Sequence, residues 1–272
     1  MAGPIFASTE KVMRALEGCA ISGLAPASAA ELASCSLLRR QETKFLIAAN
    51  SVAALVQAIA ADYRVAYAGT AWLARYRTLY FDTRGLHCFK SQRGPLPHHN
   101  VRIRHYDDRR LSVVEVKTKG SNTQTLKSRL AKKYGDSTLS AQDLNFVGSH
   151  SPLCGQDLMP QVWTNYSRVT LVGGAEERVT MDCDLDFVGG EIHQHVPDLV
   201  VIEVKQARFS QNTPIMRALQ RLSLGPARIS KYGAALALTS AHLHAATRST
   251  GRAERYHRDF GSSAMADTEG QG

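Results

Sequence analysis

Basic side chains recur at every second position in several short apolar stretches. Arg102 and Arg104 alternate with aliphatic residues, and the pentapeptide Val113–Lys117 (VVEVK) recurs as Val201–Lys205 (VIEVK). In a strand, alternate side chains point to opposite faces, so each stretch would gather its cations and its single carboxylate on one face. Arg offers forked donors to phosphate oxygens and Lys a mobile point charge. The pattern therefore indicates a face that binds a multiply negative ligand such as a chain of phosphates.

The elements that must position these residues follow from the same periodicity. It predicts strands over residues 38–47, 75–82, 101–106, 111–119, 161–172, 178–187 and 199–206. Gly173–Gly174 reads as a hairpin turn between two of them. Helical spacing predicts helices over residues 51–62, 139–147 and 214–222, with Ser51 and Thr213 as caps and Pro214 in a first turn.

Taken alone, each charged strand face would be a solvated surface. Together the faces carry Arg or Lys repeatedly, often with one Glu, which is less varied than a solvent face. A closed barrel with polar rows inside and apolar rows packed outside under helices gives this pattern. Clustered cations in a cavity of low dielectric need an anion. We therefore predict an α+β fold, an antiparallel β tunnel barrel with a basic polar lumen, flanked by a few helices.

Composition agrees with a polyanionic partner. The 272 residues include 33 Lys and Arg against 24 Asp and Glu, a formal charge of +9. No apolar run approaches the roughly 20 residues that cross a bilayer, and a secretory signal pattern is lacking. Five widely spaced cysteines predict buried thiols in a reducing cytoplasm rather than a disulfide framework or zinc knuckle. We expect an N-terminal extension at 1–36, one domain at 37–238 and a disordered tail at 239–272.

Eight motifs carry a family resemblance. They are Arg40–Leu46, Tyr80–Thr83, Val101–Tyr106, Glu115–Lys117, Asn165–Arg168, Arg178–Asp182, Val201–Lys205 and Ser230–Tyr232. In this order they resemble the catalytic domain of the vacuolar transporter chaperone (VTC) polyphosphate polymerases, a branch of the triphosphate tunnel metalloenzymes. The resemblance implies a phosphotransferase that moves the γ-phosphate of ATP onto a polyphosphate chain with Mn²⁺ or Mg²⁺. ATP and inorganic polyphosphate are the implied partners, without a specific nucleic acid, and a membrane-protein partner is left open.

The resemblance also implies roles for individual residues. The catalytic, phosphate-gripping lining would be Lys44, Arg102, Arg104, Lys117, Arg168 and Arg178. Further substrate-binding residues would be Arg40, Lys127, Lys205 and Lys231. Glu203 matches the metal-binding carboxylate, while Glu42 and Glu115 would assist the metal or hold basic neighbours in place. Loss of Arg102 or Arg168 is expected to slow turnover with little loss of stability, because crowded positive charge is relieved.

Other functions within the same fold stay open. Arg40 stands where the wider superfamily has the first glutamate of Glu-x-Glu-x-Lys, as in the polymerase branch. This favours a polymerase over a tripolyphosphatase, thiamine-triphosphatase or adenylate cyclase, because losing a carboxylate weakens a second metal site. A catalytically inactive polyphosphate-binding module, or a triphosphate hydrolase, would keep the same lining residues.

Three further patterns have competing interpretations. A nucleic-acid-binding protein should interleave aromatics with Arg and Lys on one face, whereas we expect the aromatics here mostly on rows opposite the charges. Each of the pairs His193/His195 and His242/His244 could share a metal, but we expect exposed loop or tail histidines. The row Asp182/Asp184/Asp186 is a supplementary metal site, the charge of an edge strand, or an ion-pair partner of Arg178 in the lumen. The cluster at Lys127–Lys133 is either a solvated surface or a phosphate-entry patch.

Overall fold

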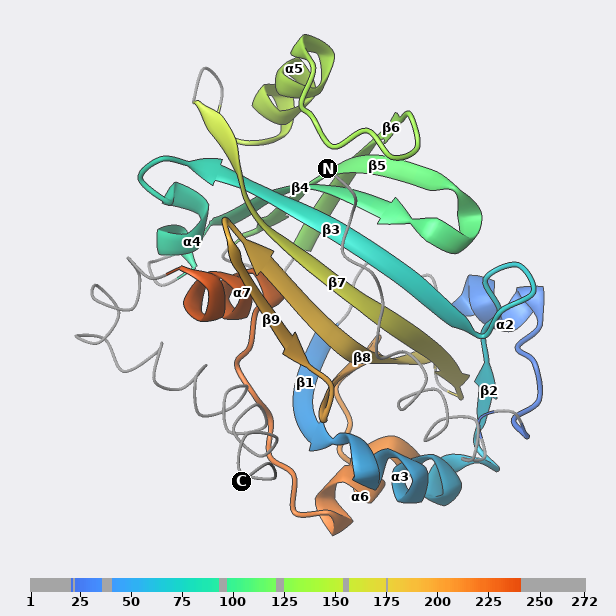
Figure 1. The fold of residues 1–272 in the computed structure, drawn as a ribbon. Helices are drawn as coiled ribbons and strands as arrows, with labels where there is room; N and C mark the ends of the chain where they lie inside the picture. Colours follow the sequence, from blue (N-terminus) through green and yellow to red (C-terminus); the bar gives the residue numbers. More distant parts are fainter. Residues whose placement is uncertain are drawn as a thin grey trace, which may run out of the picture.

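The computed structural model describes residues 21, 23–35, 41–92, 97–120, 125–153, 157–174 and 176–240. Figure 1 shows them built around one long twisted sheet. Most of the predicted N-terminal extension and almost all of the predicted C-terminal tail lie outside the described residues, as do Arg40 and the pair His242/His244. Cys35, Cys88 and Cys183 are buried free thiols, as expected, while Cys19 and Cys154 lie outside the description.

The strands of the described chain pair antiparallel in a single ten-stranded sheet. They are β1 (Gln41–Ala48), β2 (Tyr63–Val65), β3 (Leu73–Thr83), β4 (His98–Tyr106), β5 (Leu111–Lys119), β6 (Thr125–Lys132), β7 (Leu158–Gly173), β8 (Glu177–Gly189), β9 (Ile192–Val196) and β10 (Leu199–Gln206). The order is β1-β10-β8-β7-β3-β4-β5-β6, with β2 on β7 and β9 on β8. The predicted strands are present, and β7 and β8 meet at Gly173–Gly174. A Cβ at Gly173 would lie 2.5 Å from the Tyr63 ring, so this hairpin needs glycine.

Closure of the sheet into a barrel is not confirmed. β1 and β6 lie at opposite ends of the strand order and are not paired with each other in the described structure. The edge of β1 is instead partly covered by the chain that precedes the last helix. There the Ala227 N–H donates to the Lys44 carbonyl (2.7 Å), and Lys44 Nζ donates to the Ile229 carbonyl (3.2 Å). The antiparallel, α+β character of the prediction is confirmed, whereas the closed barrel is not confirmed.

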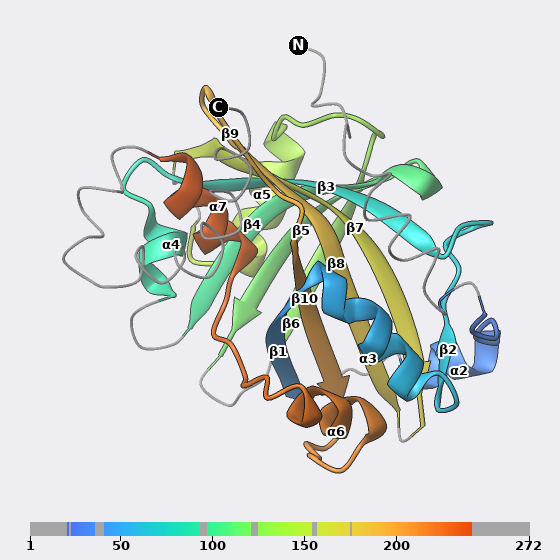
Figure 2. The same ribbon diagram turned by 60° about the horizontal axis from the view of Figure 1, so that its bottom comes forward.

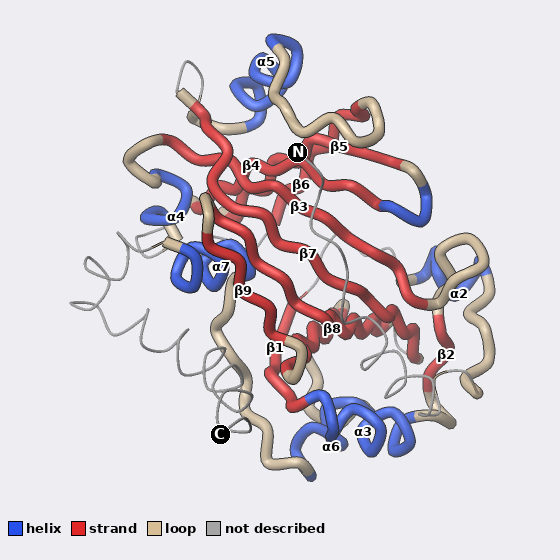
Figure 3. Tube along the Cα trace, viewed as in Figure 1, coloured by secondary structure: helices blue, strands red, loops and turns tan. Residues whose placement is uncertain are grey.

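Short helices surround the sheet, as Figure 3 shows by colour. They are α2 (Ala29–Ser34), α3 (Val52–Ile59), α4 (His87–Ser91), α5 (Ala141–His150), α6 (Pro214–Arg221) and α7 (Lys231–Thr239). The three predicted helices correspond to α3, α5 and α6. Ser51 and Thr213 take the N-cap positions of α3 and α6, but neither side chain makes a capping hydrogen bond with the described residues. Ser51 ends a 3₁₀ turn, and the Thr213 hydroxyl oxygen accepts from Gln206 Nε2.

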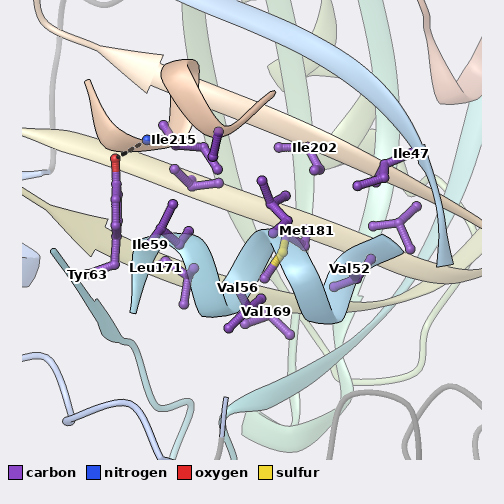
Figure 4. Packing of buried hydrophobic residues seen from close by; sticks show 14 of the residues in the cluster. Ile47, Val52, Val56, Ile59, Tyr63, Val169, Leu171, Met181, Ile202 and Ile215 are labelled. Carbon is purple, nitrogen blue, oxygen red and sulfur yellow. Dashed lines mark hydrogen bonds between the residues drawn. The ribbon is translucent and has the colours of Figure 1, made fainter. Parts of the chain in front are cut away.

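One hydrophobic core lies under α3 and α6, which pack side by side on one face of the sheet (Figures 1 and 2). Alternate residues of β1 and β10, such as Ile47 and Ile202, belong to the same cluster of buried side chains as Val56 and Ile59 of α3 (Figure 4). These side chains occupy one parity of each strand, because strand side chains alternate between the two faces. The other parity forms the opposite face, which carries the charged residues.

Candidate functional site

The strand register gathers the predicted lining residues on that opposite face, here called the charged face. Lys44 of β1 lies across from Glu203 of β10, Arg102 of β4 from Glu115 of β5, and Arg168 of β7 from Asp182 of β8. Directly opposed residues of an antiparallel pair point to the same side of the sheet. Lys117 is two positions beyond Glu115 and shares this face. The predicted common face of Arg102 and Lys117 is therefore found.

Glu203 is the centre of one group of charges. Lys205 Nζ lies 2.6 Å from its carboxylate, Lys44 Nζ 3.5 Å and Lys231 Nζ 4.0 Å. Lys44 also reaches Glu42 at 3.4 Å, so the two glutamates share one lysine. Burial by itself would raise the pKa of Glu203, but Lys205, Lys44 and Lys231 outweigh it and hold the pKa well below the usual range. Glu203 is therefore an ionised, almost buried carboxylate at neutral pH.

Asp182 forms a second group directly beside the first. Arg168 donates to it from Nε (2.5 Å) and NH2 (2.7 Å), a bidentate pair, and Lys231 Nζ donates to Oδ2, the same oxygen that accepts from Arg168 NH2. Asp182 is fully buried. Lys231 is the first residue of α7, and the hydroxyl oxygen of the cap residue Ser230 accepts from the Gly233 N–H. The start of α7 therefore brings a cation between Asp182 and Glu203.

Tyrosines share the charged face with the arginines, which corrects the expectation that the aromatics lie opposite the charges. The Arg168 guanidinium lies 5.1 Å from the Tyr76 ring centroid and 5.3 Å from that of Tyr166, and the two rings stack at 5.2 Å. On β3 the opposite face is taken by Arg75 and Arg77. They pair with Asp108 and Asp107, which lie in the 3₁₀ turn Asp107–Arg109 that follows β4. Since β3 has arginines and tyrosines on alternate positions, its periodicity does not indicate which row faces inward.

A third group surrounds Glu115. Its four cationic neighbours are Arg102, Arg104, Lys127 and Arg129. Burial opposes ionisation of Glu115, but Arg102, Arg104 and Lys127 hold its pKa well below normal. None of these four cations contacts Glu203 in the described structure, so Glu115 is separate from Glu42 and Glu203. Arg129 was not among the predicted site residues, although its position two residues after Lys127 on one strand was a signal for it.

Lys117 is influenced by charged residues of both β1 and β4. Burial lowers its pKa, Glu42 opposes this, and Lys44 and Arg102 lower it further. Because Glu42 and Lys44 belong to β1, at one end of the strand order, and Lys117 to β5, next to the other end, these two parts of the sheet approach each other across the charged face. Arg178 lies opposite Lys205 at the start of β8, while the described cations in contact with Asp182 are Arg168 and Lys231 rather than Arg178.

The row of aspartates does not act as one site. A register shift between β7 and β8 interrupts the alternation, and Asp184 adopts a positive φ of 54°. Asp184 Oδ1 accepts from His195 Nε2 at 2.8 Å, and Asp186 contacts His193, so each histidine has its own aspartate. The supplementary metal interpretation of Asp182, Asp184 and Asp186 is therefore not supported.

The carboxylates of the charged face can hold a divalent metal only when substrate phosphate completes the metal's coordination shell. No cluster of three or more His, Cys, Asp or Glu side chains that could hold a metal occurs in the described parts of the chain. Mg²⁺ is commonly held by one or two carboxylates while substrate phosphates and waters complete its shell. Glu42 and Glu203, which share Lys44, meet that requirement. Glu115 is already surrounded by four cations and does not.

These features define a protein with a basic, largely buried face on a curved antiparallel sheet, suited to anions. The family model of the VTC domain matches residues 39–240, and the chain belongs to that family. No curated protein matches the chain.

The solved structures to which this chain is similar have low sequence identity and TM-scores below 0.5. A putative adenylate cyclase from Bacillus halodurans is 14% identical with a TM-score of 0.46, over 71% of this chain and 94% of that one. A putative adenylyl cyclase from Hippeastrum, described as having a dominant triphosphatase activity, is 13% identical with a TM-score of 0.44, over 73% and 95%. In the described residues, no helix has the length and apolar character required to span a bilayer.

Proposed function

We propose that the protein is a polyphosphate polymerase-type phosphotransferase, which moves the γ-phosphate of ATP onto a phosphate chain bound at the charged face. The observation that carries this proposal is the surplus of basic side chains over carboxylates on the charged face. Around Glu203 and Asp182, four cations face three carboxylates when Glu42 is included, and around Glu115 four cations face one. A surplus of this kind favours a ligand that brings several negative charges.

The arrangement also suits phosphoryl transfer. The transferred group carries charge over its equatorial oxygens, so catalysis depends on positioned cations rather than on covalent chemistry by the protein. Arg102 and Arg168 supply forked donors that are fixed by carboxylates, and Lys44, Lys117 and Lys205 supply point charges between them. A divalent metal held by Glu42 and Glu203 would neutralise phosphate charge.

Two other functions are compatible with the same face, and one assay separates them. Purified protein is incubated with ATP and Mn²⁺, and both polyphosphate on a gel and free phosphate are measured. A polymerase makes polymer, a triphosphate hydrolase releases phosphate without polymer, and a binding module retains polyphosphate without turnover. Formation of phosphate alone, or no turnover, would reject the polymerase assignment.

A matched pair of arginine variants tests the site itself. Arg104 lies on the charged face with its side chain 7% exposed, and its Nε donates to the Thr78 hydroxyl oxygen (3.1 Å). Arg77 lies on the opposite parity of β3 and pairs with Asp107. Arg104→Gln should lower turnover by about 10²–10³, the scale of losing one preorganised donor, and Arg77→Gln by less than about twofold. If the two substitutions lower turnover equally, the charged face does not take part in catalysis as proposed.

A further inference from the structure

One fully buried carboxylate on β5, that of Glu115, is contacted by four cations. The distances to its oxygens are 2.6 Å from Arg102 NH2, 2.6 Å from Lys127 Nζ, 2.9 Å from Arg129 Nε and 3.9 Å from Arg104 NH1. A carboxylate offers about four acceptor positions, so Glu115 is saturated by these neighbours. Its one negative charge faces three guanidinium groups, so at least two positive charges are left uncompensated within the group. Burial, together with Arg102 and Arg104, lowers the pKa of Lys127 to about 6, because the group already holds more positive than negative charge.

The four cations differ in their access to solvent. Their side chains are 7% exposed for Arg104, 13% for Arg102, 23% for Lys127 and 56% for Arg129. The exposed fraction therefore decreases from Arg129 and Lys127, on the edge strand β6, to Arg102 and Arg104 on β4, deep in the charged face. Because all four touch the same carboxylate, an anion that contacts Arg129 has the next cation within reach at each step.

The surplus belongs to this group and not to β6 as a whole. Lys132, on the opposite parity of the same strand, is neutralised by Asp136 (2.8 Å) and Asp143 (2.7 Å). Lys133 lies just beyond the strand and is exposed. The predicted basic cluster is thus divided in two, and only Lys127 and Arg129 face Glu115.

We propose that Lys127 and Arg129 form the entry site for phosphate chains, and that Glu115 is a resident counter-anion whose cations the entering phosphates come to share. This rests on the proposed function, since it concerns the same charged face. Four cations around one carboxylate repel one another, and phosphate groups, with more oxygens and more charge, satisfy them better than Glu115 alone. Glu115 then holds the cations in position for the anion and is not a metal ligand.

The first test compares two cations at the end of β6. Binding of tripolyphosphate to the full chain is measured by calorimetry, with EDTA and without ATP, for wild type, Arg129→Gln and the control Lys133→Gln. Arg129→Gln should weaken binding about five- to tenfold, because a charge-assisted contact is lost, and Lys133→Gln less than about twofold. Equal affinities of the two variants would overturn the entry site.

The second test removes the counter-anion. Glu115→Gln should bind tripolyphosphate about tenfold more tightly than wild type, because the competing carboxylate charge is gone, and tripolyphosphate should raise its melting temperature by more. Weaker or unchanged binding overturns the counter-anion role. If Glu115→Gln does not fold, the Arg129 comparison alone decides.

The outcomes also separate this inference from the proposed function. Wild-type protein that does not bind tripolyphosphate overturns both. Binding that responds as expected, without polymer formed from ATP, overturns only the enzymatic function. Wild-type binding with polymer formation, but with Arg129→Gln equal to Lys133→Gln, overturns only the entry site.

Discussion

The Arg168→Ala substitution should destabilise the protein strongly, contrary to the expectation from crowded charge alone. Arg168 makes two hydrogen bonds, of 2.5 and 2.7 Å, to the fully buried Asp182, whose other described cation is Lys231. Removing one partner of a buried pair costs about 3–5 kcal/mol. Because Lys231 still compensates part of the Asp182 charge, we expect a loss of about 2–4 kcal/mol in the free energy of unfolding.

Arg102→Ala provides the comparison, since Glu115 keeps three other cations when Arg102 is lost. No carboxylate is left unpaired and repulsion falls, so the expected loss is about 0–1.5 kcal/mol. Urea unfolding of both variants measures the difference, and a double-mutant cycle with Asp182→Asn isolates the Arg168–Asp182 coupling. A loss below about 1 kcal/mol for Arg168→Ala, or one equal to that for Arg102→Ala, would refute the reasoning.

Three further predictions follow from individual contacts. Glu203→Gln should abolish Mn²⁺-stimulated turnover and leave metal-free tripolyphosphate binding intact or tighter. If the rate of the variant depends on Mn²⁺ as the wild-type rate does, Glu203 is not part of the metal site. Tyr232→Phe should lower the free energy of unfolding, measured with urea, by about 1–2 kcal/mol. The buried Asp82 loses the tyrosine hydroxyl donor (2.7 Å) but keeps three backbone N–H donors. No measurable loss of stability would contradict this. Burial, together with Arg77, lowers the pKa of His105 to about 4, so the unfolded state takes up the proton first and stability should fall as pH drops from about 6.5 toward 4. His105→Gln should flatten that part of the profile, and an unchanged profile would count against the assignment.

The sequence by itself determined the strands and, within each strand, which residues share a face. A period of two forces residues such as Arg102 and Arg104 to the same side, whatever the strand pairs with. The order of motifs then indicated the family, which the match over residues 39–240 confirms. The helix α7 was missed because its residues 231–239 are almost uniformly apolar and small, so they lack the amphipathic spacing that predicts a helix.

Only the tertiary structure decided which charges meet. Glu42, Glu115 and Glu203 look equivalent in sequence, yet register places the first and last around Lys44 and encloses Glu115 among four cations from β4 and β6. Asp182 acquires Lys231 from a helix 49 residues away. Likewise, the edge of β1 is covered by residues 227–229 rather than by β6. Periodicity is a local property of the backbone, whereas ion-pair partners and closure depend on long-range pairing, which no local pattern encodes.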